Sequence, residues 1–211
     1  MVSEGAMSSL KRYKQKRNFK VTSEPAGKTR HTTSKSFQFV IQQHAARAMH
    51  YDVRLEIDGV MVSWAVPKGP SLNPKIKRLA IQTEDHPIEY NKFEGIIPEG
   101  EYGAGPVIIW DRGTYKNLKE DSMKSCLKEG RIEIRMRGKK LKGDFALVRT
   151  GSATGEKSHW LLIKMKDEHA DARRNITQSE PQSVKSGKTI KDLQKKMKES
   201  KKNKKTKVVY G

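Results

Sequence analysis

The chain places two histidines and an aspartate, His44, His50 and Asp52, within nine residues. If His50 and Asp52 lie on one strand, they share a face about 7 Å apart, and a turn over residues 45–49 would bring His44 back beside them. Two imidazoles and a carboxylate suit a divalent first-row metal with open positions for water or substrate. The nitrogen ligands argue against magnesium, and the absence of nearby cysteine argues against structural zinc. Spacing alone leaves a solvated sheet face as open as a metal site, with a buried polar network as a further alternative.

Two arginines and a third histidine occupy polar positions of neighbouring predicted strands. Arg54 lies two residues after Asp52, while Arg78 and His86 belong to a later run. Guanidinium groups would repel a bare metal ion, but they fit if a phosphate bridges the cation and the arginines. Phosphoester hydrolysis needs a metal that orients water, arginines that hold phosphate oxygens and a histidine that protonates the leaving alkoxide. For Glu84, a plain surface ion pair with Arg78 is an equally good interpretation.

The other reactive residues carry weaker signals. Lys68 stands in a loop with two prolines and a glycine, residues 67–71, which either holds it toward phosphate or is a plain tight turn. The glycine-rich stretch 93–106 lacks the Gly-Lys-Ser/Thr ending of a Walker loop, so it favours a loop or a bent strand. Nothing local makes Ser63 a nucleophile. Cys126 has no adjacent histidine and is interpreted as packing.

Alternating apolar and polar residues predict strands through the middle of the chain. The predicted runs are 36–42, 50–57, 60–66, 78–84, 107–110, 131–136, 145–148 and 160–165. Asp58-Gly59 predicts a tight hairpin turn, because both positions tolerate positive φ, and residues 122–129 form the best helix. Seven or eight short strands suggest a sandwich or a barrel. We predict a mainly β fold, a small closed barrel with one or two short flanking helices, in which Trp64 and Trp110 belong to the core.

The positive charge is concentrated at both ends of the chain. Its 211 residues carry 44 Lys and Arg against 24 Asp and Glu, a net charge of +20. Residues 1–35 contribute +7 and residues 171–211 contribute +9, whereas residues 36–170 contribute only +4. We therefore predict a folded body, 36–170, between a basic N-terminal arm and a Lys-rich flexible tail that could form a helix near residues 189–198. Such arms typically attract phosphate backbones; the alternative is that they serve only solubility.

Composition excludes several classes of protein. No run approaches the roughly 18 apolar residues of a membrane span, and the N-terminus lacks the apolar region of a signal peptide. The single cysteine excludes an internal disulfide framework and a multi-cysteine zinc site. These features predict a cytoplasmic protein, and no pattern suggests a dimer interface, so we expect a monomer.

Several ordered motifs resemble the 3′-phosphoesterase domain of bacterial DNA ligase D. The resemblance begins with the run from His44 to Gly59, which reads HAARAMHYDVRLEIDG, and continues with SWAVPKGPS at residues 63–71. Shorter matching runs follow: KRLA from Lys77, TEDHP from Thr83, FEGIIP from Phe93, YGAG from Tyr102, WD from Trp110 and WLLIK from Trp160. Together they cover roughly residues 17–168.

The resemblance implies a manganese-dependent nuclease-type hydrolase that acts on DNA or RNA/DNA 3′ ends, such as those of a primer-template. As a 3′-phosphodiesterase it would remove a terminal ribonucleoside, and as a 3′-phosphomonoesterase it would then remove the remaining 3′-phosphate. The resulting 3′-hydroxyl suits extension or sealing in DNA repair by non-homologous end joining. Other first-row metals, such as Co²⁺ or Zn²⁺, suit the same ligands.

The resemblance also assigns roles to residues. It implies that His44, His50 and Asp52 bind the metal. Phosphate contacts, metal-site completion and positioning then fall to a further set of residues: Arg17, Glu24, Arg54, Lys68, Arg78, Glu84, His86 and Tyr90. Among these, His86 would contact phosphate or act as the acid. Asn18 departs from the family pattern, in which an acidic residue is usual.

The chain is too short for polymerase and ligase modules, and residues 56–59 lack the lysine of a ligase nucleophile motif. We therefore expect a stand-alone phosphoesterase that cooperates with separate ligase, polymerase and end-joining factors, its basic tail replacing covalent tethering. One rival hypothesis is a non-catalytic nucleic-acid-binding barrel. Another is an iron-dependent oxygenase, because His50-x-Asp52 followed by His86 imitates a facial triad, although the arginines fit it poorly.

Overall fold

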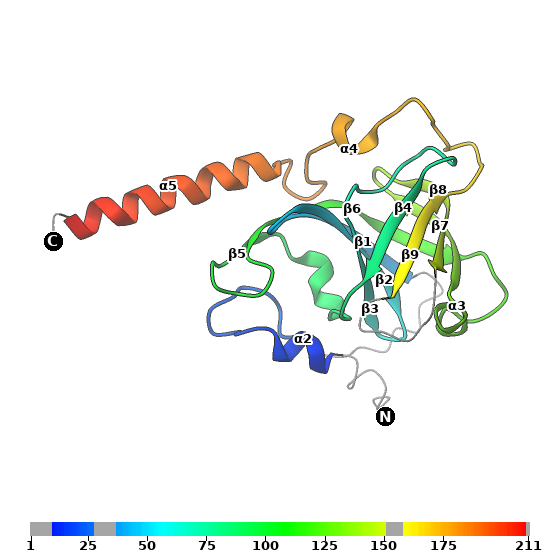
Figure 1. Ribbon diagram of the computed structural model, residues 1–211, viewed down its shortest axis with the longest axis horizontal. Coiled ribbons are helices and arrows are strands. Elements are labelled where there is room, and N and C mark those ends of the chain that lie inside the picture. Colours follow the sequence, from blue (N-terminus) through cyan, green and yellow to red (C-terminus); the bar gives the residue numbers. More distant parts are fainter. Residues whose placement is uncertain (1–9, 28–36, 151–157, 210–211) are drawn as a thin grey trace.

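The barrel predicted from the sequence is present in the structure. The computed structural model describes residues 10–27, 37–150 and 158–209. Its strands are β1 (Phe37–Ala45), β2 (Met49–Ile57), β3 (Val60–Val66), β4 (Lys77–Gln82), β5 (Gly95–Ile97), β6 (Gly105–Asn117), β7 (Arg131–Gly138), β8 (Lys142–Thr150) and β9 (His159–Lys164). In this part of the chain, eight strands in the order β1-β2-β3-β4-β9-β8-β7-β6 close through a β1–β6 pairing, and β5 extends β6 (Figure 1).

Helices flank the barrel rather than form its wall. They are α2 (Lys11–Gln15), the 3-10 helix η1 (Ile88–Lys92), α3 (Met123–Glu129), α4 (Ile176–Ser179) and α5 (Ile190–Val209). The helix predicted at 122–129 is α3, where Ser122 caps the first turn and Gly130 adopts a left-handed conformation at the end. In the described residues, no helix has the length and apolar composition that crossing a membrane would require.

The barrel interior holds the main hydrophobic core. Trp64, Trp110 and Trp160 are all fully buried, as are Val53 and Leu55 of β2. The β2–β3 hairpin turns at Asp58 and Gly59, with φ values of 51° and 82°, as the Asp-Gly pair predicted. Strand alternation therefore directs one set of β2 side chains into the core and the other set outward.

The outward face of β1 and β2 is also covered. Asp52, Arg54 and Glu56 alternate with the core residues of β2, and they are only 6%, 3% and 1% exposed. Two aromatic residues, Tyr13 of α2 and Tyr90 of η1, lie edge to face beside this surface and are buried. The solvated sheet face considered from the spacing is therefore excluded, because the N-terminal segment and η1 pack over it.

The strand predicted over residues 78–84, which would place His86 on the face of Arg78 if it continued, is shorter than expected. Strand β4 ends at Gln82, which pairs with Trp64, and His86 forms an isolated bridge with Met61. Between these two pairings, the segment from Gln82 to His86 advances four residues, whereas the partner segment from Met61 to Trp64 advances three. The one extra residue therefore turns the His86 side chain to the opposite face from the one that strict alternation predicts. Arg78 shares its facing with the buried Ala80, whereas His86 lies on the opposite face; their predicted common face is wrong.

The segment after β9 packs along the barrel. Ile176 joins the main core, and Trp110 Nε1 donates to the Glu180 carbonyl at 2.7 Å. The predicted helix near 189–198 is α5, in which Ile190 and Leu193 pack against Ile108 of β6 and Ala45 of β1. From this anchor, the backbone of α5 runs away from the barrel (Figure 1).

Candidate active site

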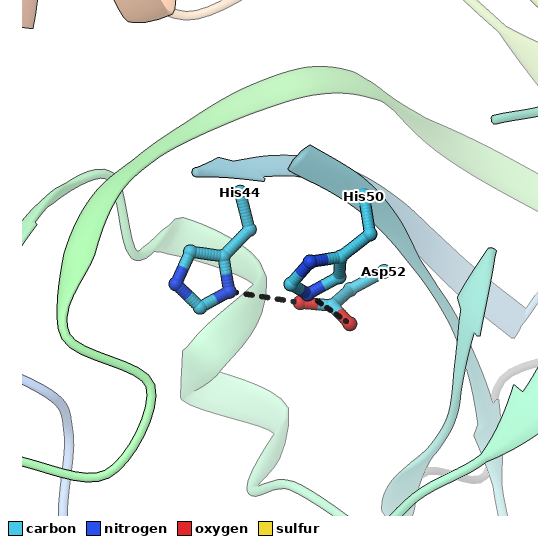
Figure 2. Close-up of side chains that lie close together, drawn as sticks. All are labelled: His44, His50 and Asp52. Carbon is cyan, nitrogen blue, oxygen red and sulfur yellow. Dashed lines mark ion pairs between the residues drawn. The ribbon is translucent and has the colours of Figure 1, made fainter. Parts of the chain in front are cut away.

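His44, His50 and Asp52 meet on the outer face of the β1–β2 hairpin. His44 pairs directly with His50 across the two strands, and Asp52 lies two residues further along β2. One ligand atom from each residue lies within 4.8 Å of the others. Figure 2 shows both imidazole rings directed toward the carboxylate. The three residues that the spacing brought together are thus a compact potential metal centre.

Hydrogen bonds to backbone carbonyls orient both imidazole rings. His44 Nε2 lies 2.7 Å from the Gly103 oxygen, and His50 Nδ1 lies 2.9 Å from the Ala48 oxygen. Because a carbonyl only accepts, these nitrogens carry protons, and in the neutral rings His44 Nδ1 and His50 Nε2 are the nitrogens with a lone pair. Each of the two lies 3.6 Å from a carboxylate oxygen of Asp52. Two lone pairs facing a carboxylate, with the far nitrogens bonded to carbonyls, are the donor set that a first-row divalent metal requires.

Asp52 is ionised in this environment. Burial by itself would raise its pKa, but the charge of Arg54 and the contacts with His44 and His50 more than offset burial and hold the pKa well below its usual range. Arg54 Nη2 donates to Asp52 Oδ2 at 3.1 Å. A carboxylate that keeps its charge while buried is suited to bind a cation.

Arg54 is held in place by polar partners on both neighbouring strands. Its Nε donates to Gln42 Oε1 at 2.8 Å, and its Nη1 donates to Ser63 Oγ at 2.9 Å. Ser63 in turn donates to the Met61 carbonyl at 2.9 Å. Ser63 therefore orients an arginine, consistent with the absence of any nucleophile signal in the sequence.

His86 lies between two guanidinium groups. Its Nδ1 is 2.9 Å from Arg54 Nη1, and its Nε2 is 3.2 Å from Arg17 Nη2. Burial, followed by the charges of Arg54 and Arg17, lowers the pKa of His86 well below its ordinary value. The imidazole is therefore neutral at neutral pH in the substrate-free protein.

The N-terminal segment contributes a buried charged network to this site. Arg17 Nε donates to Glu24 Oε1 at 2.9 Å, and the Tyr90 hydroxyl donates to the same oxygen at 2.8 Å. Arg17 also pairs with Glu84 at 3.3 Å. The structure thus brings together all four of these residues with His86, although they come from two separate parts of the chain, residues 17–24 and 84–90.

Lys68 and Arg78 are not joined to this network. Among the described residues, no hydrogen bond or ion pair connects either side chain to the His44–His50–Asp52 group or to Arg54, and Arg78 Nε is buried without a hydrogen-bond partner. Their roles in phosphate binding remain predictions.

Asn18 uses its backbone N–H to donate to Glu101 Oε2 at 3.2 Å.

Comparison with known proteins agrees with this geometry. Residues 42–149 match the model of the DNA ligase D 3′-phosphoesterase domain. The multifunctional non-homologous end joining protein LigD of Pseudomonas aeruginosa is 45% identical over 184 residues, 86% of this chain and 22% of that protein. The corresponding DNA repair protein of Mycobacterium tuberculosis strain H37Rv is 46% identical over 159 residues, 75% of this chain and 20% of that protein.

The chain thus spans about a fifth of the length of these curated relatives. The family match includes the three potential metal ligands, Arg54 and His86. These residues lie side by side in the structure. The chain belongs to the DNA ligase D 3′-phosphoesterase domain family.

Proposed function

We propose that this protein is a manganese-dependent phosphoesterase that processes the 3′ ends of nucleic acids. It removes a terminal ribonucleoside as a 3′-phosphodiesterase and then the 3′-phosphate as a phosphomonoesterase, and it leaves a 3′-hydroxyl for end joining. One observation carries the proposal: the His44–His50–Asp52 group lies directly beside two buried phosphate-binding candidates, Arg54 and His86.

The donor set supports a resident divalent cation held by His44, His50 and Asp52. When bound, such a cation polarises a phosphoryl oxygen and lowers the pKa of water. Manganese is our proposal, and Co²⁺ or Zn²⁺ also suits two imidazoles and a carboxylate. Gly103 and Ala48 carbonyls keep both imidazole lone pairs available to the cation.

Arg54 binds the scissile phosphate in this proposal. Three of its five N–H groups donate to Gln42, Ser63 and Asp52, and its Nη1 also lies beside His86. One Nη2 N–H is left to donate to a substrate oxygen, from a guanidinium that is already fixed. Preorganised donors of this kind stabilise the charge that develops on the phosphate in the transition state.

Arg17 and His86 complete the phosphate site. Glu24 and Glu84 hold the Arg17 guanidinium beside His86, and Tyr90 holds Glu24. An anionic phosphate placed here would offset the positive charges that lower the pKa of His86, and the imidazole would then be better able to protonate a leaving alkoxide. Lys68 and Arg78 are proposed to contact phosphates as well.

The substrates that we propose are primer-template ends that carry a 3′-terminal ribonucleotide or a 3′-phosphate. Ligase, polymerase and other end-joining factors are the proposed partners. The names of the longer relatives describe multifunctional end-joining proteins, which supports this setting.

The test incubates the protein with a primer-template ended by a ribonucleotide or by a 3′-phosphate, with and without Mn²⁺, and resolves the processed primer on a denaturing gel. We expect wild-type turnover only with the metal, and a loss of about 100-fold or more in His50→Ala. Calorimetric titration with Mn²⁺ should show weakened binding by the same variant.

The matched control is His159→Ala, because His159 is an exposed histidine on β9. It should keep wild-type turnover and Mn²⁺ affinity. If His50→Ala and His159→Ala both processed the ends as wild type does, the site would be assigned wrongly and a non-catalytic nucleic-acid-binding barrel would be the better account.

A further inference from the structure

An exposed aromatic ring stands at the edge of the metal-binding group. Tyr102 is 54% exposed, and the next residue, Gly103, accepts the hydrogen bond from His44 Nε2. Among the described residues, the other large hydrophobic side chains with comparable exposure are aliphatic or methionine: Val21, Met49, Leu79 and Leu118. Single exposed apolar residues are common, so the way in which this ring is held matters more than its exposure.

The loop that carries Tyr102 is fixed at several points. Two turns close it, with Glu101 N donating to the Pro98 oxygen and Ala104 N donating to the Glu101 oxygen. The Glu101 carboxylate accepts from Asn18 N, which ties the loop to the N-terminal segment. Gly103 has a φ of +78° and lies so close to His44 that an added Cβ would be 3.4 Å from Cε1. The ring is therefore presented by a constrained loop that touches a potential metal ligand.

Cationic groups surround the same ring. Lys16 Nζ lies 4.5 Å from the ring centroid, and Arg17 Cζ lies 6.0 Å from it. Lys16 also pairs with Glu84 at 3.2 Å. Proteins that bind single-stranded nucleic acids combine aromatic rings, on which bases stack, with cationic side chains that attract the phosphates.

We propose that Tyr102 is a stacking platform for the nucleobase of the 3′-terminal nucleotide, while the phosphate of that nucleotide sits at the His44–His50–Asp52 group. This inference rests on the proposed function and adds a base-binding site to it. Stacking on an aromatic ring does not depend on base identity. The site therefore takes any nucleoside 3′-phosphate end and discriminates against ends that lack a base.

The experiment compares two 3′-phosphate primer-templates in Mn²⁺, one with an intact terminal base and one with an abasic terminal nucleotide. On the intact end, Tyr102→Ala should lower kcat/KM about 5- to 150-fold, the range that removal of one stacked base corresponds to. On the abasic end, the same variant should match wild type within about twofold. Tyr102→Phe should behave as wild type on both ends.

A second measurement avoids turnover. A primer whose unpaired 3′-terminal base is 2-aminopurine is titrated with protein in the absence of divalent metal, and its fluorescence is followed. Wild type and Tyr102→Phe should quench the signal by stacking, whereas Tyr102→Ala should not. Leu118→Ala, which removes an exposed apolar side chain elsewhere, is the control and should quench as wild type does.

The outcomes separate this inference from the proposed function. If wild type dephosphorylates neither end, the proposed function fails. If wild type is active but Tyr102→Ala loses equally on intact and abasic ends, or still quenches 2-aminopurine, the ring does not hold the base and the inference is overturned. Thermal unfolding of Tyr102→Ala should match wild type, because the side chain is largely in water.

Discussion

His86 is a buried imidazole whose two nitrogens face two guanidinium groups. Burial and the charges of Arg54 and Arg17 lower its pKa well below 6.5. In the unfolded chain an ordinary histidine binds a proton near pH 6.5, whereas in the folded protein this histidine resists protonation. The unfolded state therefore gains protons first as the pH falls, and the folded state loses stability.

This linkage predicts that the free energy of unfolding decreases between pH 7 and pH 5, with His86 contributing up to about 1.4 kcal/mol per pH unit. His86→Gln should remove that contribution and flatten the profile below pH 6.5. Urea denaturation of both proteins across this range, without metal, measures the effect. Parallel profiles for the two proteins would contradict it.

Glu24 is the anchor of the buried network at the N-terminal segment. Its carboxylate accepts from Arg17, Tyr90 and Thr22 and is almost fully buried. Glu24→Gln keeps the shape but leaves the Arg17 charge without its closest counter-ion. Removing one partner of a buried ion pair leaves the other charge buried without compensation. We therefore expect a decrease of about 3 kcal/mol in the free energy of unfolding.

The control for this prediction is a surface pair. Lys124 pairs with Asp58 at 2.8 Å, with side chains 73% and 40% exposed, so Lys124→Ala should change stability by less than about 1 kcal/mol. Urea denaturation compares the two variants. Equal effects would mean that the Arg17–Glu24 pair contributes no more than an exposed one.

At the scale of residues, the sequence predicts the reactive side chains better than the groups that hold them in place. The closeness of His44, His50 and Asp52 was predicted from residue spacing, because His50 and Asp52 share one strand and a turn returns His44 to them. The partners of Arg54 did not, since Gln42 and Ser63 lie on two other strands and reach it only through the register of β1 and β3. The Gly103 carbonyl that orients His44 carries no side-chain signal at all.

At the scale of elements, alternation predicted eight of the nine strands in the described residues, but not β5, the full length of β6 or the irregularities. The β2–β3 hairpin followed from period-two hydrophobicity and the Asp-Gly turn. The extra residue between Gln82 and His86 reverses the facing of the chain, and an alternation pattern cannot register it. The N-terminal segment has no sustained periodicity, so its packing over the site was implied by the family resemblance alone.

Gly105 marks a close approach between β6 and β1. Its φ is +140°, and an added Cβ would lie 2.1 Å from the Ala45 oxygen, next to His44. Gly105→Ala should therefore force the strands apart, cost at least about 2 kcal/mol of stability and weaken Mn²⁺ binding. Thermal unfolding and calorimetry measure the two effects.

Gly95→Ala is the matched control on the adjoining strand β5. The nearest atom to its added Cβ is 3.9 Å away, which is ordinary contact, so this variant should stay within about 0.5 kcal/mol of wild type. If Gly105→Ala were as well tolerated as Gly95→Ala, the close approach to Ala45 would not constrain the site.

For the whole molecule, much of the positive charge lies on α5, the helix whose start packs beside the His44–His50–Asp52 group. Ile190 and Leu193 fix the start of α5 against Ala45, the residue that follows His44 in the chain. Residues 195–211 then supply eight lysines and one glutamate. The anchor directs a cationic arm away from the strand that carries a potential metal ligand, and we predict that this arm contacts the phosphate backbone of the substrate.

A truncation that tests this arm should begin after the anchor. Deleting residues 171–211 would remove Ile176 from the core and the Glu180 carbonyl from Trp110. That deletion confuses folding with binding, whereas deletion of 195–211 leaves both contacts and the Ile190 and Leu193 anchor. We expect the shorter protein to keep wild-type thermal stability.

The shorter deletion should weaken primer-template binding and make it less dependent on salt. The slope of log K against log[salt] should fall in magnitude by about 0.9 for each duplex phosphate that the arm no longer neutralises. The value of kcat at saturating substrate should stay unchanged, because we expect the arm to act in binding and not in the chemical step. Fluorescence anisotropy at several salt concentrations measures the slope. A full-length variant with the eight lysines changed to glutamine should reproduce the deletion if charge is the cause; an unaltered slope in both proteins would mean that α5 does not contact the nucleic acid.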